Sequence, residues 1–257
     1  MQKECASRQP VVGARALAQG VKMGDVGISF RNSTGAKGFT LAEVLLTLAI
    51  IGVIAALTIP AVVTKVAKDQ YVTGLKKAYN TLKSVEREAI QEHGPMENWT
   101  WSTGYDPIAD FEKYFLPHFD VLKNCKSTTE KGCFAEGLTY LNGDTLGDFN
   151  GARYYRIVTS DGMSWAYINT NTGGTNPLES RGAFYVDVNG LKGPNRYGRD
   201  MFYFYVFPSN LGIKPQGSYE PDGTTPISTS DVDSHCNTSS YGGYCAAKVL
   251  SEGAMNY

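Results

Sequence analysis

The strongest constraint on this 257-residue chain is one long apolar run near its start. From Val44 to Val63 the sequence reads VLLTLAIIGVIAALTIPAVV, which is 20 residues without a charge. At about 1.5 Å of rise per residue, a helix of this length spans about 30 Å, the thickness of the hydrocarbon core of a bilayer. A buried helix of a globular domain is normally shorter and carries a polar stripe. The run therefore predicts a membrane-spanning helix.

The charges on either side of the run predict its orientation. Residues 1–38 carry a net charge of +4 and residues 39–257 a net charge of −5, within a formal total of −1. Because basic flanks stay in the cytoplasm, the acidic remainder is predicted to be exported. A secretory signal peptide has a similar layout, but its apolar region is only about 7–15 residues long. This run is longer and continues directly into more predicted helix.

The junction in front of the run carries an unusual charge. Residues 35–46 read GAKGFTLAEVLL, in which Glu43 is the one carboxylate in an otherwise apolar start to the helix. An ionised carboxylate inside a bilayer is costly and usually has a function. Two interpretations follow. Glu43 either sits at the membrane interface, or it has a buried partner of positive charge.

The segment GFTLAEVLL resembles the processing site of type IV pilins and type II secretion pseudopilins. The resemblance implies that a prepilin peptidase cuts between Gly38 and Phe39 and that the new N-terminal Phe39 is methylated. It also implies that Glu43 pairs with the N-terminal amine of a neighbouring subunit during fibre assembly. The close resemblance covers residues 37–65 and includes Pro60, which matches a proline common in this family.

The resemblance implies three parts of the chain and a location for each. Residues 1–38 are a cleaved leader, residues 39–63 are the transmembrane and assembly helix, and residues 64–257 are an extracytoplasmic pilin-like domain. The protein is then a single-pass protein of the bacterial inner membrane that later enters a pilus or pseudopilus. A leader of 38 residues is long for the family, and a start at Met23 shortens it to 16 residues.

The exported part predicts an α+β fold, with one long helix packed on an antiparallel β-sheet. Between Thr64 and His93, apolar residues recur at steps of three and four, and Gly94-Pro95 ends the helix. The stripe consists of Val72, Leu75, Ala78, Tyr79, Leu82, Val85, Ala89 and Ile90. Four later segments are predicted strands: 153–159, 163–169, 182–188 and 201–207, the last of them central in the sheet.

Shorter elements fill the remaining segments. Asp161-Gly162 between the first two strands is a hairpin signal. A short helix is predicted after an Asp106 N-cap, with Ile108 on its buried face and Pro117 at its end. Trp99 and Trp101 are predicted as core residues rather than a ligand platform. The tail 208–257 is predicted to be mostly loop, with a short helix at 246–250.

The cysteines favour export. Cys5 leaves with the leader, so the mature chain keeps Cys125, Cys133, Cys236 and Cys245. An even number outside the cytoplasm indicates two disulfides, for which four cysteines allow three connectivities. Proximity in the sequence favours Cys125–Cys133 and Cys236–Cys245, and the second resembles the C-terminal bridge of pilins. A zinc site lacks its usual Cys-x-x-Cys spacing here.

One loop offers oxygen ligands, and major pseudopilins carry a calcium site in a loop between late strands. The candidate calcium ligands are Asp187, Asn189, Asn195 and Asp200. The same loop carries three basic residues that oppose a cation: Lys192, Arg196 and Arg199. We therefore favour an interpretation without a cofactor, in which the carboxylates pair with these basic residues or cap backbone amides.

Other functional classes find little support in the sequence. No Gly-x-Ser-x-Gly elbow, Walker loop or His-Glu-x-x-His motif is present, and the three histidines are widely spaced. A net charge of −1 offers no basic footprint for nucleic acid. The predicted function is therefore structural, as a subunit of a type IV pilus or a type II secretion pseudopilus, with prepilin peptidase and other subunits as partners. The alternative is a single-span, membrane-anchored extracytoplasmic binding or adhesion domain that does not polymerise.

Overall fold

The computed structural model describes residues 38–171, 173 and 176–257 of the chain. The predicted leader up to Lys37, including Met23 and Cys5, lies outside the described residues. Contacts divide the chain into two units, one ending at Gly52 and one beginning at Val53. Each unit is described by itself below.

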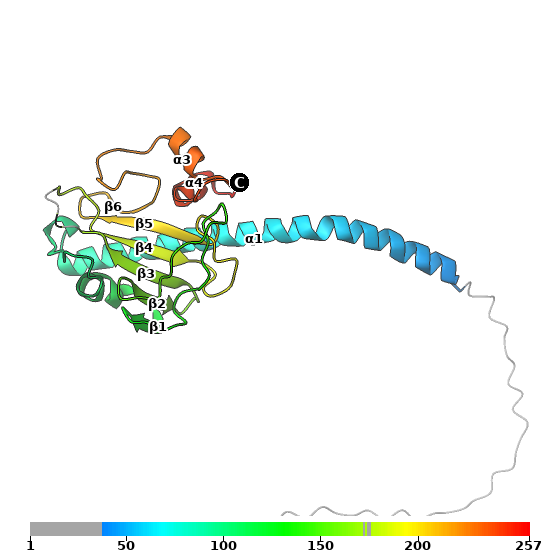
Figure 1. Ribbon diagram of the computed structural model, residues 1–257, viewed down its shortest axis with the longest axis horizontal. Helices are drawn as coiled ribbons and strands as arrows, with labels where there is room; N and C mark the ends of the chain where they lie inside the picture. The colour runs from blue at the N-terminus through cyan, green and yellow to red at the C-terminus, as the bar shows by residue number, and fades with distance from the viewer. Residues whose placement is uncertain (1–37, 172, 174–175) are drawn as a thin grey trace, which may run out of the picture. The chain divides into compact units, whose positions relative to one another are not determined.

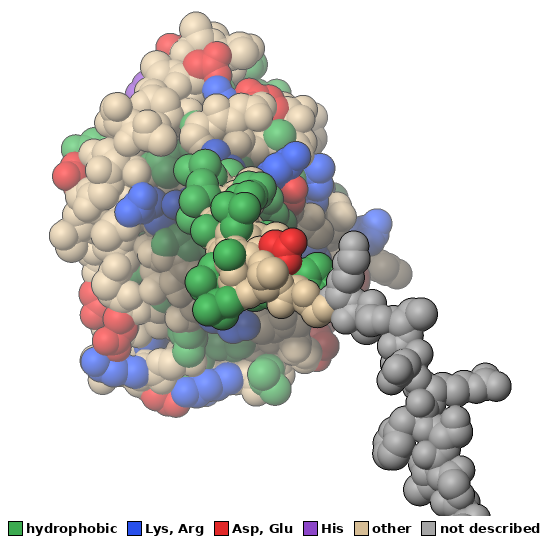
Figure 2. All heavy atoms as spheres, turned by 90° about the vertical axis from the view of Figure 1, so that its right-hand side faces the viewer, with side chains coloured by type: hydrophobic (Ala, Val, Ile, Leu, Met, Phe, Trp, Pro, Cys, Tyr) green, Lys and Arg blue, Asp and Glu red, His purple; other side chains and the backbone are tan. Residues whose placement is uncertain are grey.

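Helix α1 runs from Leu41 to His93 and continues through Pro60. It is the one helix of the described residues that is long and apolar enough to cross a membrane, and none of its apolar window is buried. Figure 2 shows hydrophobic side chains exposed along it. The hydroxyls of Thr47 and Thr58 donate to backbone carbonyls one turn back, both at 2.9 Å. These bonds satisfy the polar groups that a bilayer leaves without water.

The part of α1 that lies in the second unit is amphipathic. Six residues of the predicted stripe are buried: Val72, Leu75, Ala78, Leu82, Val85 and Ala89. The helix ends at Gly94, whose φ is +77° and whose N–H donates to the carbonyl of Ile90 at 2.9 Å. A left-handed residue with this bond is a common helix end, and glycine adopts it without strain. The predicted stripe and helix end are confirmed.

Six antiparallel strands form one sheet in chain order, so every connection joins neighbours (Figure 1). They are β1 (Val121–Lys126), β2 (Tyr155–Thr159), β3 (Ser164–Asn169), β4 (Gly182–Asp187), β5 (Met201–Phe207) and β6 (Gly212–Pro215). The four predicted strands correspond to β2–β5, and the α+β class is confirmed. The prediction missed the two edge strands, β1 and β6. The interior position expected for β5 is confirmed, because β5 pairs with β4 on one side and with β6 on the other.

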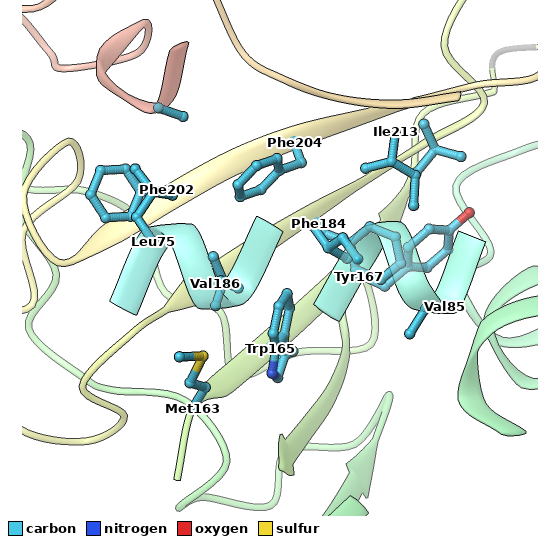
Figure 3. Close-up of a cluster of buried hydrophobic side chains, with 14 of the residues drawn as sticks. Leu75, Val85, Met163, Trp165, Tyr167, Phe184, Val186, Phe202, Phe204 and Ile213 are labelled. Carbon is cyan, nitrogen blue, oxygen red and sulfur yellow. The ribbon is translucent and has the colours of Figure 1, made fainter. Parts of the chain in front are cut away.

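Strands β2–β5 are buried on both faces of the sheet. On one face, Trp165, Phe184 and Phe204 pack in a single core with the buried stripe of α1 (Figure 3). On the other face, alternate residues such as Ala166 and Ala183 pack with side chains of the segment between β1 and β2. Burial on both faces makes a strand read as an almost continuous apolar run. This explains why β5 resembled a central strand in the sequence.

Short helices surround this framework. They are η1 (Met96–Asn98), α2 (Ile108–Asp110), η2 (Phe111–Phe115), η3 (Leu116–His118), α3 (Thr229–His235) and α4 (Cys245–Glu252). Pro107 occupies the N-cap position of α2, and the side chain of Asp106 accepts a hydrogen bond from the N–H of Ile108 at 2.9 Å. Ile108 is exposed, and Pro117 lies within η3 instead of ending the helix before it. Trp99 and Trp101 pack in the α1 core as predicted. The helix predicted at 246–250 is confirmed as α4, and the tail is more regular than expected because it also contains β6 and α3.

One contact ties α1 to the far edge of the sheet. The carboxylate of Glu86 on α1 accepts a hydrogen bond from the N–H of Ile213 at 3.2 Å. The preceding residue, Gly212, has a φ of +64°, and a Cβ atom there would lie 2.0 Å from Oε1 of Glu86. Gly212 is therefore required both by its backbone conformation and by the space that Glu86 occupies.

We predict that Gly212→Ala lowers the free energy of unfolding by about 2.5–5 kcal/mol. The left-handed conformation costs about 1–2 kcal/mol, and the displaced charged hydrogen bond adds about 1.5–3 kcal/mol. Gly94→Ala is the matched control, since its φ is also positive but nothing lies within 4 Å of an added Cβ. It should show the conformational cost alone. Denaturant unfolding of the detergent-solubilised chain measures both, and equal losses would contradict the Glu86 contact.

Candidate functional site

The predicted cleavage junction lies in exposed, non-helical backbone. Gly38, Phe39 and Thr40 precede the first residue of α1, and all three are exposed. The Phe39 side chain is 86% exposed. A peptidase needs an accessible, extended segment, so the position of the Gly38–Phe39 bond ahead of the helix suits cleavage.

Thr40 and Glu43 form a reciprocal capping box at the start of α1. The N–H and the hydroxyl of Thr40 donate to Oε2 of Glu43 at 2.9 and 3.0 Å, and the N–H of Glu43 donates to Oγ1 of Thr40 at 3.2 Å. In this arrangement each side chain satisfies a backbone donor that the helix leaves free. The sequence analysis overlooked Thr40, although the spacing Thr-x-x-Glu is the usual signal for this motif.

The capping box gives Glu43 a role within one subunit. Among the described residues no ion pair involves its carboxylate, so the two hydrogen bonds that it accepts from Thr40 hold it at the helix start. A negative charge at this end also interacts favourably with the helix dipole. A role in assembly therefore has to be separated by experiment from a role in capping.

The comparisons with known proteins bear on this segment. Residues 34–59 match the family model described as the prokaryotic N-terminal methylation motif. No curated protein and no solved structure matches the chain. The chain thus carries the prepilin signature of type IV pilins and pseudopilins, which supports a type IV pilin-like or pseudopilin protein.

The second unit contains the two disulfides that proximity in the sequence favours. Cys125 at the end of β1 bonds Cys133, and Cys236 after α3 bonds Cys245, the first residue of α4. All four cysteines are buried. Each bridge closes a loop of fewer than ten residues and so fixes an edge of the fold locally.

The loop between β4 and β5 brings two buried carboxyl groups together. Asp200 accepts hydrogen bonds from the N–H groups of Asn195 and Arg196 at 2.8 and 2.6 Å. Asp187 accepts one from the N–H of Asn189 at 3.2 Å, and its Oδ2 is buried without a partner. Burial, together with the charge of Asp200, raises the pKa of Asp187 to about 9.

The expected amide capping is found in this loop, but the expected pairing with basic residues is wrong. Among the described residues, no ion pair joins either aspartate to Lys192, Arg196 or Arg199. Turn geometry instead directs backbone amides at the carboxylates. The side-chain oxygens of Asn189 and Asn195 are also buried without partners. Unpartnered carboxylate and amide oxygens are the ligands that calcium prefers, so the residues present fit this ion.

We expect calcium to raise the melting temperature of the chelator-treated, detergent-solubilised chain in a saturable way. A ligand that binds the native state alone stabilises it by mass action, and the ion would offset the burial of Asp187 without a counter-charge. Asp187→Asn should abolish the rise. Asp144→Asn, a change at an exposed aspartate outside the loop, should keep it. No rise with the wild-type chain would mean that Asp187 is buried as the neutral acid.

Proposed function

We propose that this chain is a structural subunit of a type IV pilus or a type II secretion pseudopilus. In this proposal prepilin peptidase cuts between Gly38 and Phe39, Phe39 is methylated, and the helix anchors the subunit in the inner membrane until assembly. The observation that carries the proposal is the methylation motif at residues 34–59, which ends within the apolar stretch of α1. The exposed junction ahead of the helix supports it.

The capping box supports a specific route of assembly. Cleavage leaves the new amine on Phe39, one residue ahead of Thr40. The box holds the carboxylate of Glu43 at the same end of the helix. A methylated amine keeps its positive charge, so it is a suitable partner for the Glu43 carboxylate of an adjacent copy. Pairing between copies neutralises both charges in an apolar surrounding and sets the offset between two helices.

The exposed apolar surface of α1 supports packing among copies. In a filament, neighbouring helices replace lipid around the same side chains, so little apolar surface is newly exposed to water. Small residues within the run, Gly52, Ala55 and Ala56, allow close approach of helices. The alternative, an anchored binding domain that does not polymerise, needs the apolar run but not the charge of Glu43.

We predict that Glu43→Gln and Glu43→Val both insert in the membrane and both fail to enter filaments. Glutamine keeps the capping box, because its amide oxygen accepts the same bonds, but it removes the charge. Valine removes both. Thr40→Ala is the complementary control, since it breaks the box and leaves the charge. It should weaken the start of the helix and still assemble.

Membrane fractionation and recovery of sheared filaments measure these two properties for each variant. Normal assembly of Glu43→Gln, together with failure of Thr40→Ala, would assign Glu43 to capping alone. Absence of the wild-type chain from sheared filaments would instead favour the anchored, non-polymerising alternative.

We also predict that Gly38→Val blocks maturation while the exported domain folds normally. Nothing lies within 4 Å of a Cβ atom added at Gly38, so the substitution causes no clash within the subunit. A block therefore reports on the peptidase. Intact-mass spectrometry should find methylated Phe39 at the start of the wild-type protein and an attached leader in the variant. A wild-type chain that retains its leader, or that is cut after Ala61, would contradict the proposal.

A further inference from the structure

Two histidines that are far apart in the sequence meet at the end of α1. His93 is the last residue of α1, and His118 is the last residue of η3. Glu88 and Glu92 lie on the final turns of α1 and face the same point. We call these four residues the histidine–glutamate cluster. It lies within the second unit and shares no residue with the methylation motif or the β4–β5 loop.

The members of this cluster face one another without forming hydrogen bonds. Nε2 of His118 lies 3.6 Å from a carboxylate oxygen of Glu92, and Nδ1 of His118 lies 3.7 Å from one of Glu88. Nε2 of His93 lies 3.8 Å from the other carboxylate oxygen of Glu92. These separations are too long for hydrogen bonds, which rarely exceed about 3.2 Å for nitrogen and oxygen.

Among the four residues, His118 has the environment that most strongly indicates a bound ligand. Its side chain is only 10% exposed, and among the described residues its Nε2 is buried with no hydrogen-bond partner. Buried polar atoms of folded proteins are nearly always bonded, so an unpartnered ring nitrogen aimed at a carboxylate needs an explanation. A proton shared as an ion pair is one explanation, and a metal ion is another.

The spacing of the cluster fits a metal ion. One ligand atom from each of Glu92, His93 and His118 lies within 4.8 Å of the other two. Zinc holds nitrogen and oxygen ligands at about 2.0–2.1 Å in a tetrahedron, which places two ligands roughly 3.3 Å apart. The observed 3.6 and 3.8 Å join the two imidazoles to different oxygens of Glu92, so the three groups lie near this spacing and have to close slightly around an ion. Two imidazoles and a carboxylate are a ligand set for zinc-like ions, not for calcium.

The surroundings of the cluster also suit a cation. Nδ1 of His118 faces Glu88, and metal-bound histidines commonly direct their second ring nitrogen at a carboxylate. The ring of His93 is fixed edge-on against Tyr114, with ring centres 5.2 Å apart. Its Nε2 lies 3.1 Å from the carbonyl oxygen of Lys113, so ligation by this atom exchanges that contact for the metal. The negative end of the α1 dipole lies at the same place.

We propose that Glu92, His93 and His118 bind a divalent transition-metal ion of the zinc type, with Glu88 orienting the ring of His118. The ion joins the last turn of α1 to the connector that leads into β1. Three protein ligands leave a fourth position open to water or to a carboxylate from another molecule. This site is independent of processing and assembly at the N-terminus.

Cobalt is the most direct probe, because its visible absorption reports the geometry of its ligands. The full chain in detergent is treated with a chelator, the chelator is removed, and the chain is titrated with Co²⁺. We expect saturable binding of one equivalent, loss of the signal when Zn²⁺ is added, and no competition from Ca²⁺. His118→Ala and Glu92→Gln should abolish the signal. Glu88→Gln should weaken binding by about 10–100-fold, as for other groups that orient a metal ligand.

The third histidine of the chain provides a matched control. His235 lies on α3, outside the cluster, so His235→Ala should leave the cobalt signal unchanged. Asp187→Asn should also leave it unchanged, which separates this site from the β4–β5 loop. Circular dichroism checks the fold of each variant, and Glu92→Gln reports on the site if His118→Ala does not fold. The proposal would be overturned if the wild-type chain did not bind Co²⁺, or if His118→Ala and Glu92→Gln bound it as tightly as the wild type. The cluster would then be a set of ion pairs.

Discussion

The fold of the second unit depends on the packing of one helix face against one sheet face. The stripe from Val72 to Ala89 on α1 is buried against the side chains of β2–β6 that point to the same side. This burial is why the helix can continue as a single element from an apolar stretch into an amphipathic one. The hydrogen bond from the N–H of Ile213 to Glu86, at one edge of the sheet, adds a directional interaction to packing that is otherwise hydrophobic.

The start of α1 is stabilised by different surroundings from those of its end. Among the described residues nothing covers the apolar stretch, so its stability in water is poor and a bilayer or other helices around it would stabilise it. Glu43 links these two surroundings. Within a subunit it caps its own helix through Thr40, and in the proposed filament it meets the amine of a second copy. One carboxylate can do both, since the capping bonds leave its other oxygen free to accept from a neighbour.

Local sequence patterns predicted the elements that depend on interactions between residues close together in the chain. The stripe of α1, its end at Gly94 and four of the strands follow from periodicity and turn residues. Strands β1 and β6 were not predicted, because β1 is an irregular, mostly exposed edge strand and β6 has only four residues. The Thr40–Glu43 box follows from its Thr-x-x-Glu spacing, whereas the apolar surroundings of Glu43 indicate a positively charged partner outside its own helix.

Contacts between distant segments were beyond sequence reasoning. Nothing local indicates that His118 folds back onto the end of α1, because this depends on how η1, α2 and η2 turn between them. In the β4–β5 loop, opposite charges close in sequence suggested ion pairs. The turns instead present backbone N–H groups to Asp187 and Asp200. The contacts of His118 and of the two aspartates both depend on the direction in which side chains point, and composition does not encode this direction.

The central claim is that this chain leaves the membrane to become part of a filament. Immunogold electron microscopy, with antibodies to the exported domain, tests it most directly in cells that express the chain with its own assembly machinery. Our account predicts gold particles along filaments, and loss of filament labelling in a strain without prepilin peptidase. Labelling confined to the membrane in both strains would contradict it.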